Sequence, residues 1–159
     1  MGIEGLRVGH GFDVHPWSGD PQRRLVLGGV LFDNHAGLEG HSDADVVSHA
    51  CTDALLSAAG MGDIGTLFPD TDDGFANADS LRLLAIVIGR LGVGGWHPIN
   101  VDITVIADSP KIAPQRDTMA KTLSEVVGAP VTVKGKRTEG LPGLAGGIQC
   151  HAAALVVKK

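Results

Sequence analysis

Three residues of types that bind metal ions, Asp13, His15 and His49, occur in the N-terminal third of the chain. Residues two apart in an extended segment point to the same side, so Asp13 and His15 can reach one ion. His49 falls in a segment of helical periodicity, and one carboxylate with two imidazoles suits zinc with a fourth, catalytic position left open. However, an Asp-x-His motif also arises by chance, and a mid-helix histidine is commonly an ordinary side chain. Spacing alone does not bring residues 13 and 49 together.

Further polar residues surround His49 in the sequence. Asp45 and Asp53 are each four positions from it on one helical face, and we expect one of them to orient its imidazole. His41 and Ser42 precede the same helix, whose N-terminus would offer N–H groups to a phosphate. Local sequence favours a simpler interpretation, in which Ser42 or Asp43 caps the helix and the acid at Asp45, three positions after Ser42, bonds back to the cap.

Two other segments have groups suited to sugar or phosphate chemistry. The acids at 63, 70 and 72 lie in a long loop, where they are either turn formers or ligands for sugar hydroxyls or a hard cation. Residues 134–139 (KGKRTE) place three cations within four residues, followed by Glu139. They can cradle a diphosphate with a divalent ion on Glu139, or form a solvated strand end, and the residues leave both interpretations open.

The composition predicts a folded, mildly acidic protein. Of the 159 residues, 43% are hydrophobic and 19% charged, which is enough to fill one core. The net charge is -5 and no Lys/Arg-rich run occurs, which argues against nucleic-acid binding. Cys51 and Cys150 form no C-x-x-C pair, so we expect both to be reduced and buried. With no leader-like opening and no apolar run of membrane-spanning length, we expect a cytoplasmic protein and no membrane partner.

The hydrophobic patterning predicts one domain over residues 1–159, of α/β (α+β) class, in which helices cover one face of a mixed sheet. We expect strands at residues 6–15, 24–27, 30–32, 101–107, 131–136 and 151–157. We expect helices from the Ser42 cap to Gly60, from 80 to 91 and from 115 to 127. The Gly9-x-Gly11 pair begins a dinucleotide fingerprint, but Val14 breaks it, and no P-loop or G-x-S-x-G motif is present.

These segments together resemble the 2-C-methyl-D-erythritol 2,4-cyclodiphosphate synthases of the non-mevalonate isoprenoid (terpenoid) pathway. The matching stretches are RVGHGFDVH (7–15), GHSDADVVSHACTDALLSAAGMGDIG (40–65), FPDTD (68–72), NVDITVIADSPKIAP (100–114) and VKGKRTE (133–139). They occur in the family's order and cover nearly the whole chain. The resemblance implies a homotrimer with active sites between adjacent subunits. It also implies a lyase that cyclises 4-diphosphocytidyl-2-C-methyl-D-erythritol 2-phosphate and releases CMP.

The resemblance also implies functions for individual residues. Zinc would be held by Asp13, His15 and His49, and a Mg or Mn ion by Glu139. Residues binding the methylerythritol phosphate end would be His41, Ser42, Asp63, Gly65, Phe68, Asp70 and Asp72. The cytidine pocket would consist of Ala107, Asp108, Ser109, Pro110, Lys111, Ile112 and Ala113.

The chain departs from the family's pattern in one region. A Thr-rich run normally precedes the glutamate, but here Lys136 and Arg137 stand there and only Thr138 is kept. Residues 140–147 (GLPGLAGG) are shorter than the usual segment and lack its phosphate-binding arginine. We therefore hypothesise that Arg137 or Lys136 supplies the missing charge. The alternatives are a non-catalytic homologue that binds metal and cytidine nucleotide, and a metal-dependent phosphohydrolase.

Overall fold

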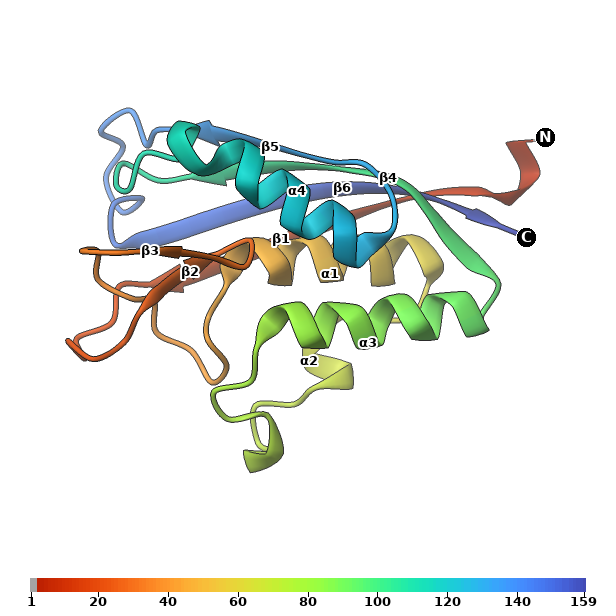
Figure 1. The fold of residues 1–159 in the computed structure, drawn as a ribbon, viewed down its shortest axis with the longest axis horizontal. Helices are drawn as coiled ribbons and strands as arrows, with labels where there is room; N and C mark the ends of the chain where they lie inside the picture. The colour runs from red at the N-terminus through yellow and green to blue at the C-terminus, as the bar shows by residue number, and fades with distance from the viewer. Residues whose placement is uncertain (1–2) are drawn as a thin grey trace.

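A four-stranded mixed sheet forms the base of the computed structural model, which describes residues 3–159 (Figure 1). Its strands lie in the order β1 (Leu6–Pro16), β6 (Gly147–Lys158), β4 (Trp96–Ile106) and β5 (Val131–Lys136). The β1–β6 and β6–β4 pairs are antiparallel, and the β4–β5 pair is parallel. Strands β2 (Leu25–Leu27) and β3 (Val30–Phe32) form a separate antiparallel hairpin.

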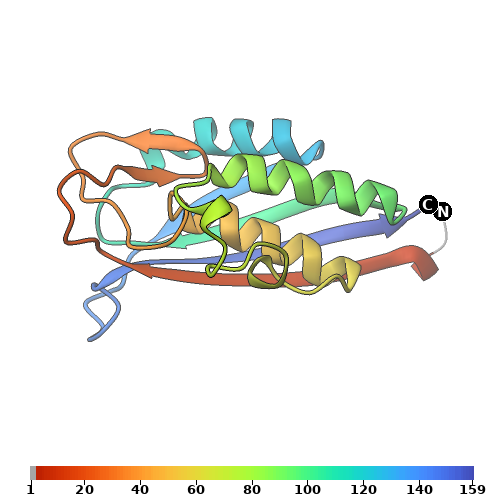
Figure 2. The same ribbon diagram turned by 90° about the horizontal axis from the view of Figure 1, so that it is seen from below.

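The three long helices lie on one face of this sheet (Figures 1 and 2). They are α1 (Val46–Ala59), α3 (Ser80–Val93) and α4 (Arg116–Val127), and α4 connects the parallel strands β4 and β5. Short helical turns complete the chain at α2 (Ile64–Leu67) and in 3-10 conformation at Ile3–Gly5, Asp73–Phe75 and Ala113–Gln115. The predicted α+β domain, with a mixed sheet and helices on one face, is confirmed. Within residues 3–159, no helix is both long and apolar enough to cross a membrane.

Two strands are longer than the sequence pattern predicted. β4 begins at Trp96 rather than at residue 101, and its pairing with β6 shifts register between Pro98 and Asn100. β6 begins at Gly147, within a glycine-rich segment that we expected to remain a loop. Proline and glycine weaken a strand pattern in the sequence, but here both segments pair with a neighbouring strand that is already in place.

The start of α1 also differs from the prediction. Ser42 does not cap the helix; Asp45 does, and its Oδ1 accepts the backbone N–H groups of Val47 at 3.1 Å and Ser48 at 3.0 Å. The same carboxylate accepts the N–H groups of Gly28 and Gly29, each at 2.7 Å. Through these bonds the fully buried Asp45 joins the β2–β3 turn to the start of α1.

Strand β1 and helix α1 are in unusually close contact. Gly9 and Gly11 are buried on the helix side of β1. A Cβ atom at Gly11 would lie 2.0 Å from the carbonyl oxygen of Ala50, and one at Gly9 would lie 2.1 Å from that of Ala54. The two glycines thus let the backbones approach. Because strand residues alternate between faces, the next residues on the helix side are Asp13 and His15.

The other face of β1 is open, and its side chains are apolar apart from His10, which lies 3.2 Å from His151. Val8, Phe12 and Val14 point away from the helices and are 75%, 45% and 49% exposed. Strand alternation places them on the sheet face opposite Gly9 and Gly11, which pack against α1. Figure 2 shows the long helices on one side of the sheet. A row of large apolar side chains at this exposure is typical of a surface that contacts another protein chain.

Candidate functional site

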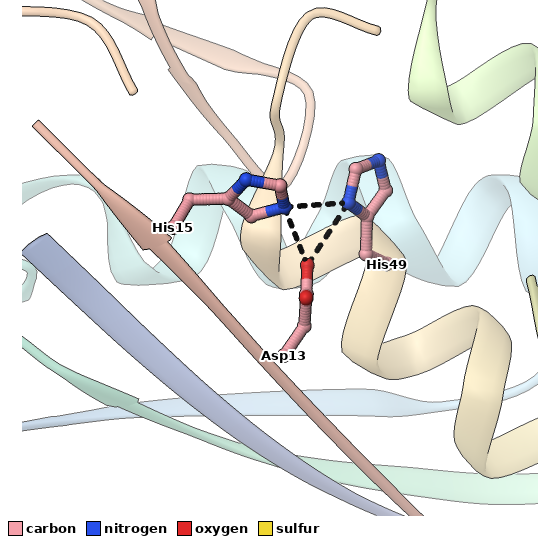
Figure 3. A group of neighbouring side chains, drawn as sticks. All are labelled: Asp13, His15 and His49. Carbon is pink, nitrogen blue, oxygen red and sulfur yellow. Dashed lines mark hydrogen bonds and ion pairs between the residues drawn. The ribbon is translucent and has the colours of Figure 1, made fainter. Parts of the chain in front are cut away.

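Asp13, His15 and His49 converge on one point between β1 and α1 (Figure 3). Asp13 Oδ2 lies 2.9 Å from His15 Nε2 and 3.0 Å from His49 Nδ1, and the two nitrogens are 3.2 Å apart. The closeness of α1 to β1 explains this convergence, because it brings the helical His49 to a strand residue 36 positions away. The residues that spacing alone could not connect are therefore brought together by the fold.

The charges of this group favour a cation. Burial by itself would raise the pKa of Asp13, but hydrogen bonds with His15 and His49 outweigh it and hold that pKa well below its usual value. Burial would likewise lower the pKa of His15, but its bond to Asp13 outweighs burial and raises the pKa. Asp13 is therefore an anion under all ordinary conditions. Protons and a metal ion therefore compete for the same donor atoms of this group.

The donor atoms fit a metal ion. In residues 3–159 this is the one cluster of three or more potential ligands, with its donor atoms within 4.8 Å of one another. His15 Nδ1 lies 2.6 Å from the backbone oxygen of Glu39. Because a carbonyl only accepts, Nδ1 must carry the proton, which leaves the lone pair of Nε2 for an ion. One carboxylate and two imidazoles are the donors that zinc binds in catalytic sites.

The expectation that Asp45 or Asp53 orients His49 is wrong. Asp45 caps α1, and Asp53 accepts the backbone N–H of Ile64 at 2.7 Å. The imidazole Nε2 of His49 instead lies 2.8 Å from the Ser80 hydroxyl and 3.1 Å from the Ser42 hydroxyl. Residues four apart on a helix share a face, but here the carboxylates of Asp45 and Asp53 bond to backbone N–H groups instead of to the His49 imidazole.

Ser80 was not identified from the sequence, and Asp43 was considered only as part of the helix start. Asp43 accepts the Ser80 hydroxyl at Oδ1 and the Ser80 backbone N–H at Oδ2, the latter at 3.1 Å. The two residues are 37 positions apart in the sequence, and helices α1 and α2 lie between them. No local pattern reveals such a contact, because serine and aspartate at helix starts are common capping residues.

A pocket of about 430 Å³ opens beside the metal-binding group. Asp13, His15 and His49 form part of its wall. Five of the expected substrate residues also line it: His41, Ser42, Gly65, Phe68 and Asp70. The other two lie outside its lining and bond to the backbone, since Asp63 accepts the N–H of Thr66 at 2.7 Å and Asp72 that of Gly74 at 2.8 Å.

The expected cytidine segment borders a second pocket, of about 200 Å³. Its lining consists of Ala107, Asp108, Lys111, Ile112 and Ala113 together with Gly135, Lys136 and Arg137. Ser109 instead lines an adjoining pocket of about 290 Å³, and neither lining contains Pro110. The 430 Å³ pocket beside the metal-binding group and the 200 Å³ pocket of the cytidine segment share no lining residue among those described.

The 134–139 segment is divided between different environments. Lys134 is paired with Asp102, with 2.5 Å between Nζ and Oδ2, so only Lys136 and Arg137 of its three cations line the second pocket. Thr138 is buried, and its hydroxyl donates to Asp108 at 2.5 Å. This bond and the N–H of Thr138 hold the pKa of Asp108 below its usual value. Glu139 is exposed and has a left-handed backbone, with φ of 54°.

Comparison with known proteins gives a consistent result. The family model described as "YgbB family" matches residues 6–157. A 2-C-methyl-D-erythritol 2,4-cyclodiphosphate synthase from Azoarcus sp. (strain BH72) is 48% identical over 158 residues, which cover 96% of each chain.

Two solved structures extend this similarity to the fold. The bifunctional IspDF from Campylobacter jejuni matches with a TM-score of 0.90 at 37% identity; the match covers 97% of this chain but 42% of that longer one. IspF from Plasmodium falciparum, in complex with CDP, matches with a TM-score of 0.83 at 35% identity over 99% of both chains. The similarity therefore spans sequence and fold over nearly the whole chain.

Proposed function

We propose how the residues of this chain, which belongs to the YgbB family, carry out its reaction. The chain is a lyase that forms 2-C-methyl-D-erythritol 2,4-cyclodiphosphate in isoprenoid precursor biosynthesis. The substrate is 4-diphosphocytidyl-2-C-methyl-D-erythritol 2-phosphate. Its 2-phosphate oxygen bonds to the β-phosphorus, the bond from that phosphorus to the bridging oxygen breaks, and CMP leaves with the electron pair. The observation that carries the proposal is the convergence of Asp13, His15 and His49 at the pocket wall.

This chemistry does not need a strong base. The nucleophile is a phosphate monoester whose second pKa is about 6, so it is largely ionised at neutral pH. What remains for the protein is to position two phosphates that repel each other and to neutralise their charge. The three metal-binding side chains at one pocket and the cations Lys111, Lys136 and Arg137 at the other are suited to that task.

The metal-binding group provides the first of these charges. Zinc on Asp13, His15 and His49 would act as a Lewis acid toward the β-phosphate. Glu139 would hold a Mg or Mn ion with its exposed carboxylate, and that ion would neutralise charge on the diphosphate. Because Asp13 contributes one negative charge and the two imidazoles are neutral ligands, a divalent ion bound there would keep a net positive charge.

The 430 Å³ pocket would receive the methylerythritol phosphate end. Ser42 contributes a hydroxyl donor to its wall for the phosphate, His41 lines the same wall with its Nε2–H donating to the Asp72 carbonyl at 3.0 Å, and Gly65, Phe68 and Asp70 line the rest. Asp63 and Asp72 stand beside this pocket at the starts of short helical turns, where Asp63 would accept a hydroxyl group of the sugar alcohol.

The second pocket would receive the cytidine end. The backbone amides of residues 107–113 would read the cytosine edge, and the CDP bound to the P. falciparum relative supports a nucleotide ligand of this class. Thr138 is already fixed by Asp108. Lys136 and Arg137 line the same pocket and would compensate for the arginine that the 140–147 segment lacks. Arg137 suits this function best, because guanidinium groups bind phosphate oxygens in a bidentate manner.

A homotrimer would complete the site. The two pockets have no wall in common within one chain, so one subunit would provide the metal and its neighbour the cytidine pocket. The open face with Val8, Phe12 and Val14 provides an apolar surface on which copies of the chain can assemble.

Release of CMP tests the proposal directly. The purified protein, depleted of metal with a chelator and then supplied with zinc and magnesium, is incubated with the cytidine diphosphate substrate, and CMP is measured by chromatography. We expect CMP only after metal is returned, and none from His49→Asn. Intact substrate with the fully loaded protein would instead indicate a homologue that binds the nucleotide without reaction.

A further inference from the structure

His49 is the only helical member of the metal-binding group, and both of its ring nitrogens have close partners. Nδ1 faces Asp13 Oδ2 at 3.0 Å and His15 Nε2 at 3.2 Å. Nε2 faces the opposite way, 2.8 Å from the hydroxyl of Ser80 and 3.1 Å from that of Ser42. A neutral imidazole has one proton, so whichever nitrogen holds it cannot bind an ion.

The partner of Ser80 decides where that proton lies. The Ser80 hydroxyl donates to Asp43 Oδ1, and the other carboxylate oxygen accepts the Ser80 backbone N–H at 3.1 Å. A carboxylate only accepts, so the hydroxyl proton of Ser80 is already committed. Its oxygen therefore presents a lone pair to His49, whose Nε2 must donate.

In the Asp43–Ser80 pair, Ser80 is buried and Asp43 is partly buried, and further hydrogen bonds hold the acid. Ser80 is 1% exposed at the start of α3, so bulk water does not compete with its hydroxyl for His49. The backbone N–H of Asp43 donates to the Ala78 carbonyl at 3.1 Å, and that of Asp45 donates to Asp43 Oδ1 at 3.2 Å. These bonds connect Asp43 to the segments that lead into α3 and α1, so its position does not depend on a bound metal.

We propose that Ser80 and Asp43 are positioning residues of the metal site, which hold the His49 imidazole in its Nε2–H form with the Nδ1 lone pair directed at the ion. The inference rests on the proposed metal site and not on the identity of the substrate. It has a consequence for Ser42: because the Ser42 oxygen also faces the Nε2–H group, the Ser42 hydroxyl proton is left for a ligand in the pocket that this residue lines.

The first test is zinc affinity. Removal of a residue that orients a metal-binding histidine typically weakens metal binding about 10- to 100-fold. We expect a loss of that size for Ser80→Ala, measured by competition with a chromophoric chelator and by the absorption spectrum of the cobalt-substituted protein. Ser80→Thr keeps the hydroxyl and should retain most of the affinity.

Ser124→Ala is the matched control. The Ser124 hydroxyl also connects two elements, because it donates to Ala120 O at 2.6 Å and accepts the N–H of Val131 at 2.9 Å. It lies on α4, which contributes no ligand. We expect Ser124→Ala to lower thermal stability and to leave zinc affinity unchanged.

The second test reads the proton itself. Long-range proton–nitrogen NMR of the zinc-loaded protein should show His49 with a proton on Nε2 that exchanges slowly with water, because the Ser80 oxygen accepts it. Ser80→Ala should remove that acceptor and speed the exchange of the proton with water. So should Asp43→Asn, because its amide can donate to Ser80 and the Ser80 oxygen is then no longer held as an acceptor for the ring.

The inference would be overturned if a folded Ser80→Ala protein bound zinc as tightly as the unsubstituted protein and gave the same Nε2–H signal. If Ser80→Ala does not fold, Asp43→Asn decides the matter by the same two measurements. Neither measurement uses substrate, so a failure of cyclisation and a failure of this inference are distinguishable.

Discussion

At the scale of single residues, the metal-binding group is a set of hydrogen bonds that fix which nitrogen faces the ion. The Glu39 carbonyl fixes His15, and the Ser80 hydroxyl lies against His49. Asp13 bonds to both rings through one oxygen. In the metal-free protein this arrangement is an ion pair between Asp13 and a protonated histidine, and it has a pH dependence that can be measured.

We expect the Asp13–His15 pair to stabilise the metal-free protein between about pH 4 and 6.5, the ordinary pKa values of the two groups. The lowered pKa of Asp13 gives stability that is present above its unfolded pKa and is lost as pH falls through the folded one. The raised pKa of His15 gives stability that is present below its unfolded pKa and is lost as pH rises through the folded one.

Thermal unfolding with chelator, at pH 6 and pH 9, measures this effect. The original chain should lose about 2–4 °C more than Asp13→Asn between the two values, the shift that ~1 kcal/mol causes in a chain of this size. Other titrating groups act on both proteins and cancel in the difference. An identical pH dependence of the two proteins would show that the pair does not contribute.

Arg137 provides the second prediction at this scale. If it neutralises charge on the transferred phosphate, Arg137→Ala should lower kcat about 100-fold, as loss of a single donor to a developing anion does. Lys121→Ala removes a cation from α4, outside the two proposed substrate pockets, and should have little effect. Near-normal turnover of a correctly assembled Arg137→Ala protein would leave the missing charge to Lys136.

At the scale of elements, the decisive contact is that of β1 with α1. A Cβ at Gly11 would meet backbone atoms, which cannot move aside as a flexible side chain can. We therefore expect Gly11→Ala to destabilise the protein by about 1–3 kcal/mol and to weaken zinc binding, because α1 carries His49. Chemical denaturation and zinc titration measure the two effects.

Gly89→Ala is the control for that substitution. Gly89 lies within α3, and a Cβ there has no neighbour within 4 Å among the described residues. Alanine should therefore stabilise the helix by about 0.5–1 kcal/mol and leave zinc affinity unchanged. Zinc affinity that is unaltered in Gly11→Ala would contradict the connection between this packing and the site.

The sequence predicted these elements better than it predicted their contacts. Periodicity identified all three long helices and the β5 strand within a few residues, because each is a run with one buried face. Gly9 and Gly11 had no assigned function, since close packing against α1 is visible only once the two elements are placed together. For the same reason His49 was identified as a ligand, but its partner Ser80 was not.

At the scale of the whole molecule, the open sheet face is the feature that a single chain leaves unexplained. Phe12→Glu would place a charge in the proposed interface between subunits, and we expect the trimer to dissociate because burial of an unpaired carboxylate is costly. Light scattering coupled to size-exclusion chromatography measures the mass. Activity should fall with the trimer, since each site would need two subunits.

Ile86→Glu is a matched control, because Ile86 is an apolar side chain with the same 45% exposure as Phe12. It belongs to α3, on the helical side of the molecule, and this variant should remain a trimer. A Phe12→Glu protein that stays trimeric would place the subunit interface elsewhere.

Phosphorus NMR of the reaction products tests the central claim most directly. The zinc- and magnesium-loaded protein is incubated with 4-diphosphocytidyl-2-C-methyl-D-erythritol 2-phosphate until the substrate is consumed. We predict two coupled resonances of a cyclic diphosphate, in equal amount to the CMP formed, because the 2-phosphate of the substrate is the nucleophile. A linear phosphate product alongside CMP would mean that water attacks instead, and would make the protein a phosphohydrolase.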